Sequence, residues 1–95
     1  MIGYIFETTC LENGKKFIGK KLSVKFDNRY LGDNEALRTD IAMYGPDAFV
    51  CKMLMPYETE KALNAAEQMY IEQGTNLYNK VEDKPKRGRK KKVDE

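Results

Sequence analysis

The sequence contains no histidine among its 95 residues. This absence excludes every mechanism that needs a histidine base or a histidine metal ligand. Ser-His-Asp hydrolases, histidine-metal nucleases and the usual zinc catalysts belong to that group. Any chemistry must therefore use carboxylates, tyrosines, lysines, arginines and a hard metal ion.

Cysteines are few, and long apolar stretches are missing. Cys10 and Cys51 lie far apart and have no partners at zinc-site spacing, so they form neither a metal site nor a disulfide framework. We expect both to be small buried hydrophobic side chains. Because no segment is apolar enough for a membrane span or a signal peptide, we expect a cytoplasmic protein with no membrane partner.

Charge is divided unevenly along the chain. Residues 1–83 carry 10 Lys and Arg against 13 Asp and Glu, whereas residues 84–95 carry 7 against 2. This asymmetry predicts a polyanionic partner that is reached through the C-terminal residues. The length allows one small domain. We expect it over residues 1–81, followed by a basic, disordered tail over residues 82–95.

The pattern of apolar and turn-forming residues predicts an α+β domain with the order β-β-α-β-α. A small mixed sheet of about three strands is expected to be flanked by helices. The strands are expected over residues 2–10, 15–20 and 48–55, and the helices over residues 35–44 and 58–73. Asn13-Gly14 is typical of a hairpin turn. Residues 21–33 are expected to form a loop, and residues 76–81 a short extended return to the core.

Three details of these elements are also predicted. Asp33 or Asn34 caps the first helix, whose apolar face carries Leu37, Ile41 and Tyr44. The third strand is so apolar that we expect it to be central or well covered, and Pro56 to end it.

Glu67 is unusual because it falls within the apolar stripe of the second helix, which Leu63, Ala66 and Tyr70 form. A carboxylate on such a face is costly unless it is paired, hydrogen-bonded or bound to a cation. Two interpretations stay open. Glu67 reaches solvent or pairs with a Lys or Arg of the fold, or it holds a divalent metal ion such as Mg²⁺.

The N-terminal residues GYIFETTCLENGKKFIGKK resemble the opening hairpin of the GIY-YIG nuclease family. The order and spacing of the motifs are most similar to those of phage and mobile-element members of that family. The later segments KKLSVKFDNRYLG, ALRTDIAMYG, DAFVCKML and AAEQMYIEQ follow in the family's order, and Tyr78-Asn79 resembles its closing step. The resemblance covers about residues 1–80.

The resemblance implies a fold and a reaction. The fold is a small three-stranded sheet flanked by helices, and the reaction is hydrolysis of DNA phosphodiesters with one Mg²⁺ or Mn²⁺ ion. By position in the motifs, Glu67 takes the metal-binding role, and Asn79 and Gly19 match the closing asparagine and the motif glycine. A phage protein of this kind is expected in the host cytoplasm.

Two positions depart from the family pattern. Phe6 and Phe17 stand where the family has tyrosines, and phenylalanine cannot move a proton or bind a water molecule. Tyr4 and Tyr30 still carry hydroxyl groups that are candidates to replace the missing ones. The alternative is that both tyrosines are packing residues.

The arginine that the family uses to stabilise phosphate charge has no secure match. Arg29 lies in the loop where it is expected, and Lys21 and Lys25 are candidate phosphate ligands in the same region, as is Lys20. Arg38 lies at the edge of the first helix's apolar face. We expect Arg29, with Lys21 or Lys25, to hold phosphate.

The tail sequence KPKRGRKKK resembles an AT-hook, although the proline that usually follows Arg-Gly-Arg is replaced by Lys90. Its cations are candidate DNA ligands, with a solubilising tail as the alternative. These residues are Lys84, Lys86, Arg87, Arg89, Lys90, Lys91 and Lys92.

The leading hypothesis from the sequence is a metal-dependent DNA endonuclease of low sequence specificity, because the chain has no room for a separate recognition domain. A separate partner protein is then expected to supply specificity. The alternative is a degenerate relative that binds DNA without cutting it, which the two phenylalanines favour. An interaction module that uses the old cleft is a third hypothesis.

Overall fold

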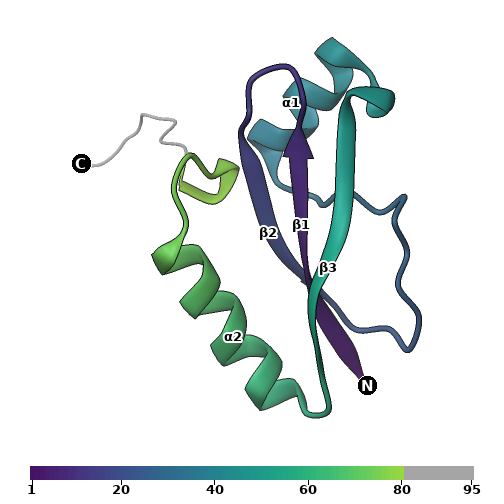
Figure 1. Cartoon of the computed structure of the whole chain (residues 1–95), viewed down its shortest axis with the longest axis vertical. Helices are drawn as coiled ribbons and strands as arrows, with labels where there is room; N and C mark the ends of the chain where they lie inside the picture. The colour runs from purple at the N-terminus through teal and green to yellow at the C-terminus, as the bar shows by residue number, and fades with distance from the viewer. Residues whose placement is uncertain (81–95) are drawn as a thin grey trace, which may run out of the picture.

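The computed structural model describes residues 1–80, and the basic tail expected over residues 82–95 lies outside them. Within the described residues the fold is α+β, with a three-stranded sheet and two α-helices, as predicted (Figure 1). The three strands are antiparallel, so the expected mixed sheet is wrong: β1 pairs antiparallel with both of its neighbours. The elements, in chain order, are β1 (Gly3–Cys10), β2 (Lys16–Lys21), α1 (Glu35–Tyr44), the 3-10 turn η1 (Pro46–Ala48), β3 (Phe49–Tyr57), α2 (Glu60–Gln73) and the 3-10 turn η2 (Tyr78–Lys80).

The hairpin between β1 and β2 turns at the predicted Asn13-Gly14 pair. Gly14 has a φ of +77°, a conformation that favours glycine, and its N–H donates to the Cys10 carbonyl at 2.8 Å. The Asn13 side chain accepts a hydrogen bond from the Lys15 N–H at 2.9 Å. The turn sets the register in which Phe6 lies opposite Gly19, and Thr8 opposite Phe17.

The strand order is β2-β1-β3, so β1 is central and the expected central position of β3 is wrong. Val50, Met53 and Met55 are exposed on β3. An apolar run cannot distinguish a central strand from an edge strand, because pairing is decided by the whole chain. Pro56 does not end β3 either, since a proline is tolerated on an edge strand.

The two faces of the sheet bury separate clusters. On the first, which we call the α1 face, Tyr4, Phe6, Cys10 and Phe17 pack with Leu37 of α1 and with Phe49. On the second, the α2 face, Ile5 and Ile18 pack with α2 and with the segment that follows it, through Leu63, Ala66 and Leu77. Alternation along β1 and β2 produces this division.

Side-chain caps begin both helices. The Asn34 side chain accepts from the Leu37 N–H at 3.0 Å, and that of Thr59 accepts from the Ala62 N–H at 3.2 Å. On α1 the predicted apolar face is partly wrong, because Leu37 is buried whereas Tyr44 is exposed.

After α2, the chain returns to the edge of the sheet. Leu77 forms a parallel bridge with Lys16, and residues 78–80 form a 3-10 turn in place of the extended segment that we expected. Of the two thiols, Cys10 is buried as predicted, but Cys51 is only half-buried; both are free. Within residues 1–80, we find no helix with the length and apolarity that a membrane crossing requires.

Candidate functional site

Glu67 lies on α2, and its side chain reaches Lys20 of the outer strand β2. One of its oxygens, Oε1, is 3.7 Å from Nζ of Lys20, and its side chain keeps 21% of its surface exposed. Lys20 points to the α2 face because it lies two residues after the buried Ile18, and side chains two residues apart on a strand share a face. The carboxylate is therefore paired with a cation, and both groups are accessible from solvent.

Asn64 completes this cluster from the preceding turn of α2. Its side-chain oxygen accepts a hydrogen bond from Nζ of Lys20. Asn64 and Glu67 are three residues apart, so they lie on neighbouring positions of one helix flank. The lysine is thus held between two oxygen-bearing side chains, and we name Lys20, Asn64 and Glu67 the Lys20 cluster.

The Lys20 cluster contains one carboxylate that is a candidate ligand for a hard cation. Its ion pair is longer than a hydrogen bond and only partly buried, so one carboxylate oxygen stays available. Mg²⁺ is commonly bound by one or two carboxylates, with waters and substrate phosphate as the other ligands. Among residues 1–80 no group of three or more acidic or cysteine ligands gathers. Glu67 is therefore the single carboxylate that the Lys20 cluster offers as a candidate metal ligand.

Asn79 lies against β2, as a site residue near the motif strand should, but its side chain serves the backbone. Its carboxamide bonds to the main chain of Ile18. Because Lys20 is two residues further along the same strand, Asn79 holds the strand that presents this lysine. Its geometry is that of a positioning residue.

Phe6 and Phe17 lie on the α1 face, on the other side of the sheet from α2. Phe6 is 1% exposed, and its ring centroid is 5.9 Å from that of Phe17. Gly19 lies beneath both rings, since a Cβ placed there would be 2.5 Å from Cζ of Phe6. The structure thus gives these three residues a packing role.

Tyr4 and Tyr30 belong to the same aromatic cluster. The Tyr4 hydroxyl is buried and accepts a hydrogen bond from the Asp27 N–H at 3.1 Å. Tyr30 packs edge-on against Phe6, and burial, followed by the negative charge of Asp33, raises the pKa of its phenol. Both tyrosines lie on the α1 face, away from Glu67.

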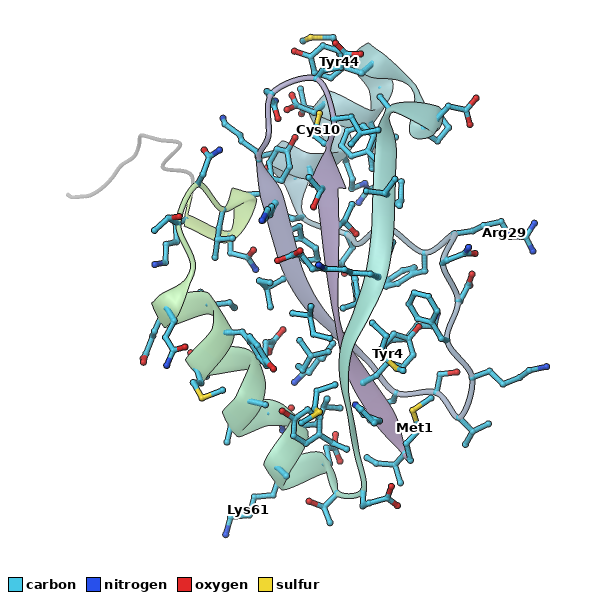
Figure 2. The ribbon with its side chains drawn as sticks, in the orientation of Figure 1. Met1, Tyr4, Cys10, Arg29, Tyr44 and Lys61 are labelled. Carbon is cyan, nitrogen blue, oxygen red and sulfur yellow. The ribbon has the colours of Figure 1, made fainter. Side chains whose placement is uncertain are left out.

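The three other predicted phosphate ligands are not brought to Glu67. Nζ of Lys21 lies 4.2 Å from the centroid of the Tyr30 ring, on the α1 face. Arg29 extends into solvent beyond the β3 side of the sheet, whereas α2 covers the β2 side (Figure 2). Lys25 is exposed in the same loop as Arg29. The structure thus does not bring these side chains to Glu67, and Arg38 is exposed on α1.

Asn64 is the residue of the cluster that sequence reasoning did not select, and the pairing of Lys20 with Glu67 was not predicted. Lys20 carried a usable signal, because it directly follows the motif glycine and lies two residues after the apolar Ile18, on the same face of β2. Asn64 carried one as well, because it lies one helical turn before Glu67. The cationic residues Lys84, Lys86, Arg87, Arg89, Lys90, Lys91 and Lys92 lie outside the described residues.

Comparison with known proteins finds one relevant similarity. The chain is similar to a protein of Enterobacteria phage T4 described as "Putative endonuclease segE", with 34% identity over 71 residues. The aligned region is 75% of this chain and 35% of the phage protein, so the chain spans about a third of its relative's length. No family model and no solved structure matches the chain.

Proposed function

We propose that this chain is a DNA endonuclease that hydrolyses phosphodiester bonds with the help of Mg²⁺ or Mn²⁺. The observation that carries the proposal is the Lys20 cluster, a carboxylate and a lysine held together on an accessible flank of α2. The T4 phage protein supports the same reaction class through its description as an endonuclease. The motif order along residues 1–80 supports a site of the GIY-YIG type.

In this proposal, Glu67 holds the divalent ion, and the side-chain oxygen of Asn64 lies one turn away as a further ligand or an anchor for a bound water. A divalent ion held there would supply positive charge for phosphate and would make a water molecule more acidic. Lys20 contacts a second phosphate oxygen as a point charge. When phosphate binds, Lys20 exchanges its ion pair with Glu67 for the phosphate contact, so the lysine always has an anionic partner.

The α1 face supports this site mechanically. Phe6, Phe17 and Gly19 fix the spacing of β1 and β2, and Asn79 fixes the outer edge of β2. With phenylalanine at both motif positions, proton transfer to and from the attacking water passes to solvent or to substrate phosphate. Low sequence specificity and a separate partner protein for target choice remain part of the proposal.

A second candidate function is DNA binding without cleavage. The observation that favours it is the loss of both motif hydroxyls at Phe6 and Phe17. General acid–base assistance contributes typically about 10²–10⁴-fold to a rate, so its loss leaves either a slow enzyme or a binding protein. The two functions differ in one measurable property, which is whether Glu67 is needed for strand breakage.

The test is nicking of a supercoiled plasmid by the full chain in Mg²⁺ or Mn²⁺. Glu67→Ala should abolish nicking, whereas Glu72→Ala, an exposed glutamate on the same helix, should keep it. Lys20→Ala should lower the rate about 10- to 100-fold, because one charge-assisted phosphate contact is lost. Lys61→Ala, also on α2, is its matched control.

Two outcomes would reject the endonuclease. Nicking that survives both EDTA and Glu67→Ala would indicate a contaminating activity or a different site. Plasmid retention without any nicking, in every metal, would establish the binding function instead. Because both glutamate variants lie on α2, their unfolding curves show whether a loss of nicking reflects chemistry rather than folding.

A further inference from the structure

A cavity separate from the Lys20 cluster opens on the α2 face, above the middle of the sheet. It has a volume of about 390 Å³, near the lower end of the range of small-molecule sites. Its walls come from all three strands, the C-terminal end of α2 and the segment after that helix. Gln73, which lines it, and Glu67 point about 120° apart around α2, since they are six residues apart.

Glu7 provides the polar group of this cavity. It lies on the central strand β1, and its side chain is only 15% exposed. Within residues 1–80 its one ion pair is with Lys52 on β3, at 3.7 Å, which is longer than a hydrogen bond. Among the hydrogen bonds of residues 1–80, none ends on this carboxylate. The Glu7 carboxylate is therefore largely buried and can accept further hydrogen bonds.

The rest of the cavity combines apolar walls with a cationic rim. Ile18, Leu54 and Leu77 offer flat apolar surface, and the Tyr70 ring lies on the helix side. Lys16 lines the opening, and Lys52 reaches Glu7 from the exposed side of β3. A ligand that fits this arrangement has a flat body, a hydrogen-bond donor at one end and a negative charge at the other.

We propose that this cavity binds one nucleotide whose base carries an exocyclic amino group, with that amino group donating to Glu7. Carboxylates accept such hydrogen bonds from the amino group of cytosine. The base lies against Ile18, Leu54 and Leu77, while the phosphate lies near Lys16. Thymine is disfavoured, because its carbonyl oxygen would face the carboxylate in place of a donor.

This inference rests on the proposed function, since it makes the cavity a base-reading subsite of a protein that acts on DNA. Lys16, Ile18 and Lys20 occupy every second position of β2 and share one face, so Lys20 lies about 7 Å along the strand from Ile18. A base that is unpaired or extruded from the duplex near the phosphate at Lys20 can therefore enter the cavity.

The test titrates the ¹⁵N-labelled full chain with dCMP, dTMP and inorganic phosphate and follows the amide signals of Ile18, Gly74, Thr75 and Leu77 by NMR. We expect dCMP to shift these signals with about tenfold higher affinity than dTMP, the effect of one hydrogen bond to a charged group. Glu7→Gln should remove the preference, because an amide also donates to thymine. Glu12→Gln, an exposed acid in the hairpin turn, should retain it.

The other outcomes of this titration each support or overturn the nucleotide subsite. Equal shifts with dCMP, dTMP and phosphate would overturn the proposal, since the lysines alone would then explain binding. Retention of the dCMP preference in Glu7→Gln would overturn it as well. A protein that prefers dCMP but never nicks DNA refutes the endonuclease and keeps the cavity. A protein that nicks DNA but has no dCMP preference refutes the nucleotide subsite and keeps the endonuclease.

Discussion

The carboxamide of Asn79 pairs with both main-chain groups of Ile18 across the outer edge of β2. Its Oδ1 accepts from the Ile18 N–H at 2.9 Å, and its Nδ2 donates to the Ile18 carbonyl at 2.7 Å. A side chain thus takes the place of a neighbouring strand. It satisfies two backbone groups that an open edge would leave to solvent or to another chain.

Removal of this carboxamide should destabilise the fold. Asn79→Ala leaves both main-chain groups of Ile18 without their partners, so we expect a loss of about 2 kcal/mol in the free energy of unfolding. Asn79→Asp should cost less, because it keeps the acceptor for the Ile18 N–H. Urea denaturation followed by circular dichroism measures both losses, and an unchanged midpoint in Asn79→Ala would show that water replaces the amide without cost.

A methyl group at Gly19 should also destabilise the fold, through overpacking. Its Cβ would lie 2.5 Å from Cζ of Phe6 and 2.7 Å from Cε2 of Phe17. Overpacking of this kind typically costs about 1–3 kcal/mol. The smaller side chain in Phe6→Leu should lower the cost of Gly19→Ala, as a double-mutant cycle of unfolding free energies can measure. Strict additivity of the two substitutions would contradict this explanation.

Tyr78 should make stability depend on alkaline pH. Its hydroxyl donates to Oδ2 of Asp40 at 2.7 Å, and burial, followed by that hydrogen bond, raises the phenol's pKa above its ordinary value of 10.0. In the unfolded chain the phenol loses its proton first. The stabilisation by Tyr78 is therefore complete below pH 10 and decreases as the pH rises above it.

Tyr78→Phe provides the comparison. The wild type should be more stable than this variant by a constant amount below pH 10, and the difference should narrow at higher pH. Unfolding free energies at a series of pH values measure this difference. Tyr44→Phe, at an exposed ring on α1, should leave the alkaline dependence as it is. A wild-type advantage that stays constant to pH 11 would disprove the linkage.

The basic residues of the C-terminal segment should control the salt dependence of DNA binding. Replacing the cations from Lys84 to Lys92 by glutamine removes up to seven phosphate contacts. Each contact contributes a slope of about −0.9 to the plot of log affinity against log salt concentration. We therefore expect the slope to become shallower by as much as about six.

Fluorescence anisotropy with a labelled duplex at several salt concentrations measures that slope. The control replaces by glutamine the six exposed cations of residues 1–80 other than Lys20, which are Lys25, Arg29, Arg38, Lys52, Lys61 and Lys80. A slope that falls only in the control would place the DNA contacts on the folded domain and assign the tail a solubilising role.

Local signals were sufficient to predict much of this fold. The Asn13-Gly14 turn, the Asn34 cap and Gly45 after α1 each act within a few residues, so the elements that they bound could be predicted from the sequence. Glu67 was also identifiable, because a carboxylate within a helical apolar stripe is costly and requires a partner. The absence of histidine excluded whole classes of chemistry through composition alone.

Only the tertiary structure decided which elements lie together. Strand order depends on long-range pairing, so β3 proved to be an edge strand despite its apolar composition. The loop that carries Arg29 leaves the sheet on the β3 side, and this side is set by packing on the α1 face. Lys20 became the partner of Glu67 because the alternation of β2 directs it toward α2. The sequence thus determined which groups are available, and the sheet determined which of them meet.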